Sequence, residues 1–226
     1  GLSSQKGTRV FDRFINRITF PFFDMSGRIV GFTGRELPND DNNSPKFLNS
    51  ADSDLFKKGE LLFGLYQARQ YIQAADKVYL TEGQFDVMRL AENGYRNSIC
   101  ASGTALTHHQ ARLIKRFTKN VTIIYDGDTA GAKAAKRNAD ILLANGLDVR
   151  AAILPLGEDP DSFIFAQGRK KFDAWLKKNE VGFIEFSYRQ NKEGIDDPIL
   201  RTKVLEDIAT SIAAVPSPIA RDNYIN

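Results

Sequence analysis

The sequence predicts an α/β fold in three parts: a mixed α+β subdomain at 1–72, a parallel sheet at 73–170 and a helical subdomain at 171–226. Two observations support this prediction. Between residues 77 and 165, short apolar runs alternate with helix-like segments, which is the pattern of parallel strands joined by helical crossovers. After residue 170, only helix-like segments follow.

Composition and charge restrict the class of protein. The chain has 226 residues, 42% hydrophobic and 26% charged, which is ordinary for a globular protein. Its one cysteine, Cys100, excludes a disulfide framework and a thiolate zinc site and fits a reducing cytoplasm. No apolar run approaches the roughly 20 residues of a membrane span, and the first residues show no signal peptide. The start without Met and the end at Asn226 predict a fragment of a longer protein.

The first part combines strands with a basic, aromatic composition. Residues 17–22 and 28–33 are expected to be strands, and Asp24-Met25-Ser26-Gly27 is a turn signal between them. Basic side chains interleaved with aromatic ones suit contacts with phosphates and stacked bases. Solvated charges over a phenylalanine-rich core explain the same composition, and composition alone favours that explanation. The residues concerned are Arg13, Arg17, Arg35, Lys46, Lys57 and Lys58, with Phe14, Phe20, Phe47 and Phe56.

Four strands and three connecting helices are expected in the second part. The strands are predicted at 78–80, 98–101, 121–125 and 149–154, and the helices at 85–93, 107–117 and 130–144. Thr107 is a good N-cap for the second of these helices. The first is expected to bury Phe85, Met88, Leu90 and Ala91. Ser162 is expected to cap a following helix, and further helices are predicted at 172–178, 183–191 and 199–215, the last ended by Pro216 and Pro218.

Acidic residues follow the ends of these strands. The buried run at 121–125 ends in Asp126-Gly127-Asp128, and Gly127 is expected to let the backbone turn sharply. Because the carboxyl ends of parallel strands share one edge, these acids can converge, although an N-cap aspartate and a turn aspartate would explain the pair equally well. Converging carboxylates repel one another unless cations lie between them. The predicted set is Glu82, Asp86, Asp126, Asp128, Asp159 and Asp161.

A cation site of this kind favours particular metals and reactions. Carboxylate oxygens select Mg²⁺ or Mn²⁺, and the single cysteine and two histidines argue against zinc. Two such ions can stabilise the attacking and leaving oxygens of a displacement at phosphorus. His108 and His109 could supply a base, but exposed residues at a helix start are the simpler interpretation.

Several motifs together resemble a known family. Glu82-Gly83-x-x-Asp86-Val87, Asp126-Gly127-Asp128 and Gly157-Glu158-Asp159-Pro160-Asp161 are similar to the TOPRIM domain, which has a Rossmann-like parallel sheet. Upstream, Arg17-x-x-Phe20-Pro21, Gly31-Phe32-x-Gly34-Arg35, Pro45-Lys46-Phe47-Leu48-Asn49-Ser50 and Phe56-x-Lys58-Gly59 resemble the catalytic core of bacterial DnaG-type primases. The resemblance runs from about Val10 to Trp175. Gln84 and Phe47 depart from it, since tyrosine is common in the family at both positions.

The resemblance implies an activity and a set of site residues. It implies a nucleotidyltransferase that makes short RNA primers on single-stranded DNA from ribonucleoside triphosphates during replication, using Mg²⁺ or Mn²⁺. Glu82, Asp126 and Asp128 would be the catalytic metal-binding acids, with Asp86, Asp159 and Asp161 supporting them. Nucleotide and template contacts would come from Arg13, Arg17, Arg35, Lys46, Asn49 and Lys58.

The resemblance also implies partners and location. A monomer at the replication fork of the bacterial nucleoid is expected, without membrane contact. The family's zinc-binding domain and its helicase-binding domain lie outside this sequence, so no zinc is expected here, and contact with the replicative helicase would need the missing domain. Two other functions remain open: a TOPRIM-type nuclease or topoisomerase, and a non-catalytic single-stranded-DNA-binding module.

Overall fold

The computed structural model describes residues 2–38, 45–103, 105–191 and 196–225. The predicted polar loop at 38–45 therefore lies largely outside the described residues. Within the described parts, no helix has the length and apolar content needed to cross a bilayer. The α/β fold predicted from the sequence is confirmed.

A five-stranded sheet organises the molecule, with the order β10-β9-β8-β6-β7. The strands β6 (Val78–Thr81), β7 (Ser98–Cys100), β8 (Asn120–Gly127) and β9 (Asp148–Leu156) are mutually parallel, whereas β10 (Val181–Gly182) pairs antiparallel with β9. The connecting helices are α2 (Gln84–Glu92), α3 (His108–Lys115) and α4 (Thr129–Ala144). The carboxyl ends of the four parallel strands consequently share one edge of the sheet.

Helices cover both faces of this sheet because alternate strand residues point to opposite sides. On one face, Val121, Ile123 and Tyr125 of β8 join a large core with α3, α4, α1 (Leu65–Ala75) and α7 (Phe183–Gln190). On the other face, Ile124 joins a smaller core with α2, α5 (Pro160–Gln167) and α6 (Arg169–Asn179). Cys100 is fully buried, as expected for a small core residue.

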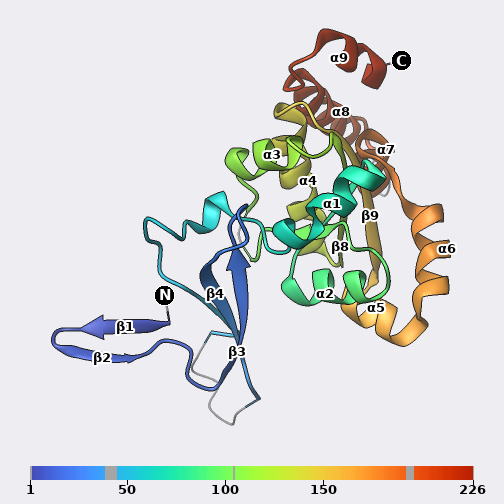
Figure 1. The fold of residues 1–226 in the computed structure, drawn as a ribbon. Helices are drawn as coiled ribbons and strands as arrows, with labels where there is room; N and C mark the ends of the chain where they lie inside the picture. The colour runs from blue at the N-terminus through green and yellow to red at the C-terminus, as the bar shows by residue number, and fades with distance from the viewer. Residues whose placement is uncertain (1, 39–44, 104, 192–195, 226) are drawn as a thin grey trace.

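The N-terminal part forms a separate three-stranded antiparallel sheet from β3 (Arg17–Phe23), β4 (Ile29–Glu36) and β5 (Phe47–Asn49). The short helix η1 (Lys58–Glu60) follows it. Before it, β1 (Ser3–Lys6) and β2 (Arg9–Asp12) form a hairpin that projects away from the rest of the molecule (Figure 1). The predicted turn at 24–27 is present: the Asp24 carboxylate accepts bonds from the backbone N–H groups of Ser26 and Arg28.

Several element predictions were wrong in detail. The sequence did not predict β1, β2, β5 or β10, and Pro218 begins a further helix, α9 (Pro218–Ile225), after α8 (Pro198–Ala213). The N-cap of α5 is Asp159 rather than Ser162, which is the third residue of that helix. Met88 is 37% exposed, and Val87 takes the buried position on α2. A one-residue error in helix phase, about 100°, is enough to exchange these neighbours.

Candidate active site

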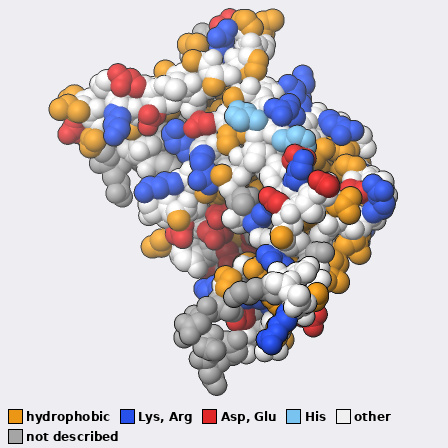
Figure 2. Space-filling model, turned by 90° about the vertical axis from the view of Figure 1, so that its left-hand side faces the viewer, with side chains coloured by type: hydrophobic (Ala, Val, Ile, Leu, Met, Phe, Trp, Pro, Cys, Tyr) orange, Lys and Arg blue, Asp and Glu red, His pale blue; other side chains and the backbone are white. Residues whose placement is uncertain are grey.

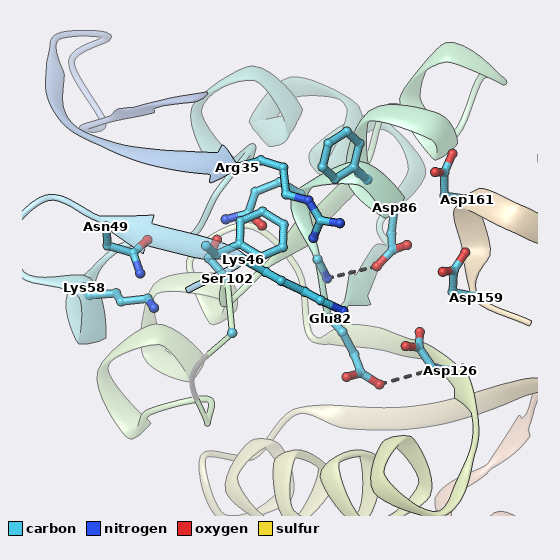
Figure 3. Close-up of a pocket in the computed structure, with 15 residues that line it drawn as sticks. Arg35, Lys46, Asn49, Lys58, Glu82, Asp86, Ser102, Asp126, Asp159 and Asp161 are labelled. Atoms are coloured by element: carbon cyan, nitrogen blue, oxygen red, sulfur yellow. Dashed lines mark hydrogen bonds between the residues drawn. The ribbon is translucent and has the colours of Figure 1, made fainter. Parts of the chain in front are cut away.

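A cavity of about 610 Å³ lies at the carboxyl edge of the parallel sheet, between this sheet and the N-terminal sheet. Five of the six predicted acids line it: Glu82, Asp86, Asp126, Asp159 and Asp161. So do four of the six predicted nucleotide and template residues: Arg35, Lys46, Asn49 and Lys58. Figure 3 shows the acids on one side of the cavity and the basic side chains on the other. In Figure 2, acidic side chains lie recessed, with lysine and arginine side chains around them.

Glu82 and Asp126 are brought together by neighbouring strands. Glu82 directly follows β6, and Asp126 lies at the end of β8, which pairs with β6 in parallel. The Glu82 Oε1 atom accepts a hydrogen bond of 3.3 Å from the backbone N–H of Asp126. The Asp126 Oδ1 atom is buried, and no described residue donates a hydrogen bond to it. A buried carboxylate oxygen without a donor is costly, and a cation is one partner that would remove the cost.

The electrostatic environment opposes ionisation of these acids. Burial, followed by the charges of Glu82, Asp159 and Asp128, raises the pKa of Asp126 to about 7. Burial also raises the pKa of Asp86 to about 7, with further contributions from Asp126, Asp159 and Glu82. The pKa of Glu82 is raised as well, chiefly by burial. Several carboxyl groups in one cavity thus repel one another when ionised, and a divalent cation would reduce this repulsion for all of them.

Two glycines allow the chain segments around Asp126 to approach closely. A Cβ atom on Gly127 would lie 1.9 Å from the carbonyl oxygen of Pro155 on β9. A Cβ atom on Gly131, in the first turn of α4, would lie 2.5 Å from the carbonyl oxygen of Asp126 and 3.0 Å from Glu82 Oε1. Gly127 does not adopt a positive φ. Lack of a side chain, rather than the sharp turn expected from the sequence, is therefore the reason for glycine at 127.

Asp128 is placed differently from its neighbour. It is exposed, it is the N-cap of α4, and its Oδ1 atom accepts a hydrogen bond of 2.6 Å from the Gly131 N–H. It lines an adjacent cavity formed with α4, β9 and α7. Its charge nevertheless contributes to the raised pKa values of Glu82 and Asp126. Asp128 thus lies at the margin of the acidic group, with one oxygen engaged in capping.

The remaining acids come from two helices that pack together, α2 and α5. Asp86 accepts a hydrogen bond of 2.9 Å from the Gly83 N–H at the start of α2. Asp159 caps α5 by accepting a hydrogen bond of 2.6 Å from the Ser162 N–H. Asp161 forms an ion pair with Arg89, with 2.6 Å between Oδ1 and Nε. Each of these acids therefore has a structural partner as well as a position on the cavity wall.

The basic side of the cavity comes from β4, β5 and η1. The Arg35 guanidinium lies over the ring of Phe47, at 4.9 Å from its centroid, and near the ring of Phe85. Burial lowers the pKa of Lys58. An anion in the cavity would favour the charged form of this lysine. These side chains can therefore bind phosphate groups facing the acids.

Arg13 and Arg17 do not line the cavity but contact the strand that does. Arg13 Nε donates to the carbonyl oxygen of Asn49 at 2.7 Å, and Arg17 donates to the carbonyl oxygens of Gly34 and Lys46. Arg17, on β3, thus contacts β4 and the residue before β5, and Arg13 contacts the last residue of β5. Sequence spacing cannot distinguish such support from a direct phosphate contact.

The helix α3 holds η1 and thereby Lys58. Gln110 is fully buried, and its side-chain amide donates to the carbonyl oxygens of Lys58 at 3.2 Å and Leu61 at 2.6 Å. Thr107 Oγ1 donates to the carbonyl oxygen of Gly59 at 2.6 Å. The predicted capping role of Thr107 is confirmed, since it also accepts from the Gln110 N–H. His108 and His109 are exposed and lie outside the cavity lining.

Some lining residues were not expected to be part of the site: Gln84, Phe85, Ser102 and Gly103. Ser102 and Gly103 follow β7 and have positive φ values of 60° and 73°. Their position just after a parallel strand indicates the shared edge of the sheet, but neither residue is charged, so the pattern of acidic residues does not include them. Gln84 and Phe85 begin α2, and the centroid of the Phe85 ring lies 5.5 Å from that of the Phe20 ring.

A divalent cation fits this group of side chains in part. Within the described part of the chain, no three His, Cys, Asp or Glu side chains already stand close enough together to hold a metal ion. The unpartnered, buried Asp126 Oδ1 and the raised pKa values nevertheless indicate a place where a cation would stabilise the fold. The donors are carboxylate oxygens, which suit Mg²⁺ or Mn²⁺.

Comparison with known proteins identifies the family. The family described as "DNA primase catalytic core, N-terminal domain" matches residues 1–69, and the Toprim-like family matches residues 79–164. A DNA primase domain from Pseudomonas aeruginosa has a solved structure that is 33% identical, with a TM-score of 0.87 over 98% of this chain and 70% of that one. The chain belongs to the DnaG-type DNA primase catalytic cores.

Other primases support the same assignment. The DNA primase of Aquifex aeolicus is 48% identical over 75% of this chain and 34% of its own length. That of Clostridium acetobutylicum is 39% identical over 100% of this chain and 37% of its own length. A DnaG primase catalytic domain solved with single-stranded DNA is 32% identical, with a TM-score of 0.83 over 98% of this chain and 72% of that one. The present primase core spans about a third of the length of the curated relatives it matches.

Proposed function

We propose that this chain is the part of a primase that joins ribonucleoside triphosphates into a short RNA primer on single-stranded DNA. The observation that carries the proposal is the paired arrangement in one cavity: Glu82 and Asp126 face Arg35, Lys46 and Lys58. Acids with raised pKa values can hold divalent ions, and the basic residues can hold a polyphosphate. The relative solved with single-stranded DNA supports a DNA template.

The three parts of the chain would divide the work. Residues 1–72 would contact the nucleotide and template, residues 73–170 would provide the metal-binding acids, and residues 171–226 would support the sheet. The primer itself and a replicative helicase, bound through a domain outside this chain, complete the proposed set of partners. The chain is expected to act as a monomer in the bacterial cytoplasm.

In the proposed mechanism, Glu82 and Asp126 would hold a divalent ion, with Asp128 beside them and Asp86, Asp159 and Asp161 in support. Such an ion neutralises charge on the triphosphate and stabilises the reacting oxygens. Arg35 would orient the triphosphate by contacts with its oxygens, Lys58 would do so from a partly buried position, and Lys46 would contact a phosphate of the template strand. Holding the α-phosphate beside the 3′-oxygen of the primer allows attack there and departure of pyrophosphate.

The decisive variant is Asp126→Asn, which keeps the size of the side chain and removes its charge. Primer synthesis with Mg²⁺ or Mn²⁺ is expected to fall by about 100-fold or more, because a charged metal ligand is lost. Asp148→Asn is the matched control, since Asp148 is exposed and begins β9 at the opposite edge of the sheet.

Near-normal synthesis by folded Asp126→Asn protein would reject the proposed site. Labelled single-stranded and supercoiled DNA, incubated with the same proteins, distinguishes the two alternative functions. Metal-dependent cutting without synthesis would indicate a nuclease or topoisomerase. DNA binding that is independent of metal, with no primer synthesis, would indicate a binding module.

A further inference from the structure

One acid in the cavity already has a positively charged partner. Asp161 Oδ1 lies 2.6 Å from Arg89 Nε, and Arg89 also pairs with Glu92 at 3.0 Å. Among the described residues, the ion pairs include none with Glu82, Asp86, Asp126, Asp128 or Asp159. Asp161 is therefore distinct from the other predicted metal-binding acids: its charge is partly neutralised by the protein itself.

The position of Arg89 follows from the helix that carries it. Asp86 and Arg89 are three residues apart on α2 and so point to the same side of the helix. Asp86 lines the cavity, whereas Arg89 lies one turn further on, where α2 packs against α5. The Arg89 guanidinium also lies over the Phe165 ring of α5, at 5.3 Å from its centroid. Two contacts with α5 and one with Glu92 thus fix the guanidinium at the rim of the cavity.

A fixed guanidinium at this position has two effects on a cation in the cavity. It occupies Asp161 Oδ1, so this oxygen can bind an ion only if the ion pair opens. Its positive charge also repels a divalent ion placed beside Asp86 and Asp159. Both effects weaken cation binding on the side of the cavity formed by α2 and α5. Neither reaches Glu82 and Asp126 as directly, because these lie at the ends of β6 and β8.

We propose that Arg89 is a positioning residue that keeps Asp161 from acting as a metal ligand in the nucleotide-free protein. The cavity then binds one divalent ion at Glu82 and Asp126 and binds a second one weakly near Asp159 and Asp161. The bound triphosphate would supply the negative charge that the protein ligands of the second ion do not provide. This inference rests on the proposed function, because it concerns the metal requirement of the same site.

The test is a double-mutant cycle on metal binding, measured without nucleotide by titrating Mn²⁺ and following free Mn²⁺ by electron paramagnetic resonance. Arg89→Met removes the charge and keeps most of the stem. It is expected to tighten the weaker Mn²⁺ site by about tenfold, equivalent to about 1.4 kcal/mol. Arg89→Lys keeps a cation beside Asp161 and should stay close to the unmodified protein.

Asp161→Asn, made alone with Arg89 unchanged, is the second single variant of the cycle. In the presence of Arg89 it should alter Mn²⁺ affinity by less than about twofold, because Asp161 is engaged. Combined with Arg89→Met, it should reduce the tightening to the smaller part that comes from loss of the Arg89 charge alone. Glu92→Gln is the matched control: it removes the other ion pair of Arg89, which lies outside the cavity lining, and should leave Mn²⁺ binding unchanged.

Two results would overturn the inference. One is an unchanged weak site in folded Arg89→Met protein; the other is equal tightening with and without Asp161, which would show that the pairing of Arg89 with Asp161 contributes nothing to the weakness of that site. Asp126→Asn, titrated in parallel, separates this failure from that of the proposed function. If Asp126→Asn loses the strong Mn²⁺ site while Arg89→Met has no effect, the catalytic proposal stands and the role of Arg89 does not.

Discussion

Asp126 and Asp86 are held in surroundings that disfavour their charged forms. The pKa of each is raised to about 7, first by burial and then by neighbouring carboxylates. Because folding raises these values from an ordinary value near 4, the folded protein binds more protons than the unfolded chain between about pH 4 and pH 7. In metal-free protein, these two groups therefore lower the free energy of unfolding as pH rises through that interval.

This linkage predicts a pH dependence that a single substitution should reduce. In EDTA, raising the pH from 5 to 8 should lower the Tm of the unmodified protein more than that of Asp126→Asn, by about 3 °C or more. Added Mg²⁺ should raise the Tm more at pH 8 than at pH 5, because metal and protons compete for the carboxylates. Thermal unfolding followed by circular dichroism measures both effects. Identical pH profiles for the two proteins would contradict the assignment to Asp126.

At the residue scale, the sequence located the acids but not their contacts. The positions of Glu82, Asp126 and Asp159 after parallel strands were sufficient to predict one shared edge. By contrast, the pairing of Asp161 with Arg89 joins residues 72 positions apart and depends on how α2 packs against α5. The outward position of Asp128 likewise depends on the first turn of α4. Such choices are made by tertiary packing, which residue spacing does not specify.

Helix caps serve two purposes in this cavity. Asp159 caps α5 in a capping box with Ser162, and its carboxylate also faces the other acids. A substitution there can therefore change stability and charge at the same time. Asparagine is as good an N-cap as aspartate but carries no charge, so the two properties can be separated.

We predict that Asp159→Ala lowers the free energy of unfolding by about 1 kcal/mol, whereas Asp159→Asn changes it by only a few tenths. Urea unfolding provides the comparison. If Asp159 also supports cation binding, both variants should bind Mn²⁺ more weakly to a similar extent. Equal stability of the two variants would show that capping by Asp159 is unimportant.

At the element scale, prediction succeeded where periodicity was strong and failed where elements were short. The alternation of strands and helices from β6 to β9 was recognised because each strand is a buried apolar run. The two residues of β10 are too few to form a pattern, and they pair with residues of β9 that are far away in the sequence. The hairpin β1–β2 has largely exposed side chains, such as Val10 at 68% exposure, and so lacks a buried face to reveal it.

The molecule as a whole places acidic and basic side chains on opposite sides of one cavity, and each side comes from a different sheet. The N-terminal sheet provides Arg35, Lys46 and Asn49, and the parallel sheet provides Glu82 and Asp126. The sequence predicted the four parallel strands and two of the three strands of the N-terminal sheet, but not β5; it also expected Arg13, Arg17 and Asp128 in a site whose cavity they do not line. It could not predict the relative orientation of the two sheets, which depends on contacts such as those of Gln110 with Lys58 and Leu61.

This separation predicts distinct effects on DNA binding. Lys46→Ala should weaken binding of single-stranded DNA and reduce the slope of log affinity against log salt by about 0.7, the value for one lost phosphate contact. Lys178→Ala is the control, because Lys178 is exposed on α6 and lies outside the cavity lining. Asp126→Asn, measured without divalent ions, should leave the slope unchanged. Fluorescence anisotropy at several salt concentrations tests all three, and equal slopes for Lys46→Ala and the control would exclude the phosphate contact.

The single sulfhydryl group of the chain can report local opening of the sheet beside the cavity. Cys100 ends β7, next to Ser102 and Gly103 at the cavity, and burial raises the pKa of its thiol to about 12. A thiol-specific reagent can therefore react with native protein only when this edge of the sheet opens. The labelling rate therefore measures how often the structure opens locally beside the cavity. Addition of Mg²⁺ together with a nucleoside triphosphate should slow the reaction, because a ligand that favours the closed form suppresses opening.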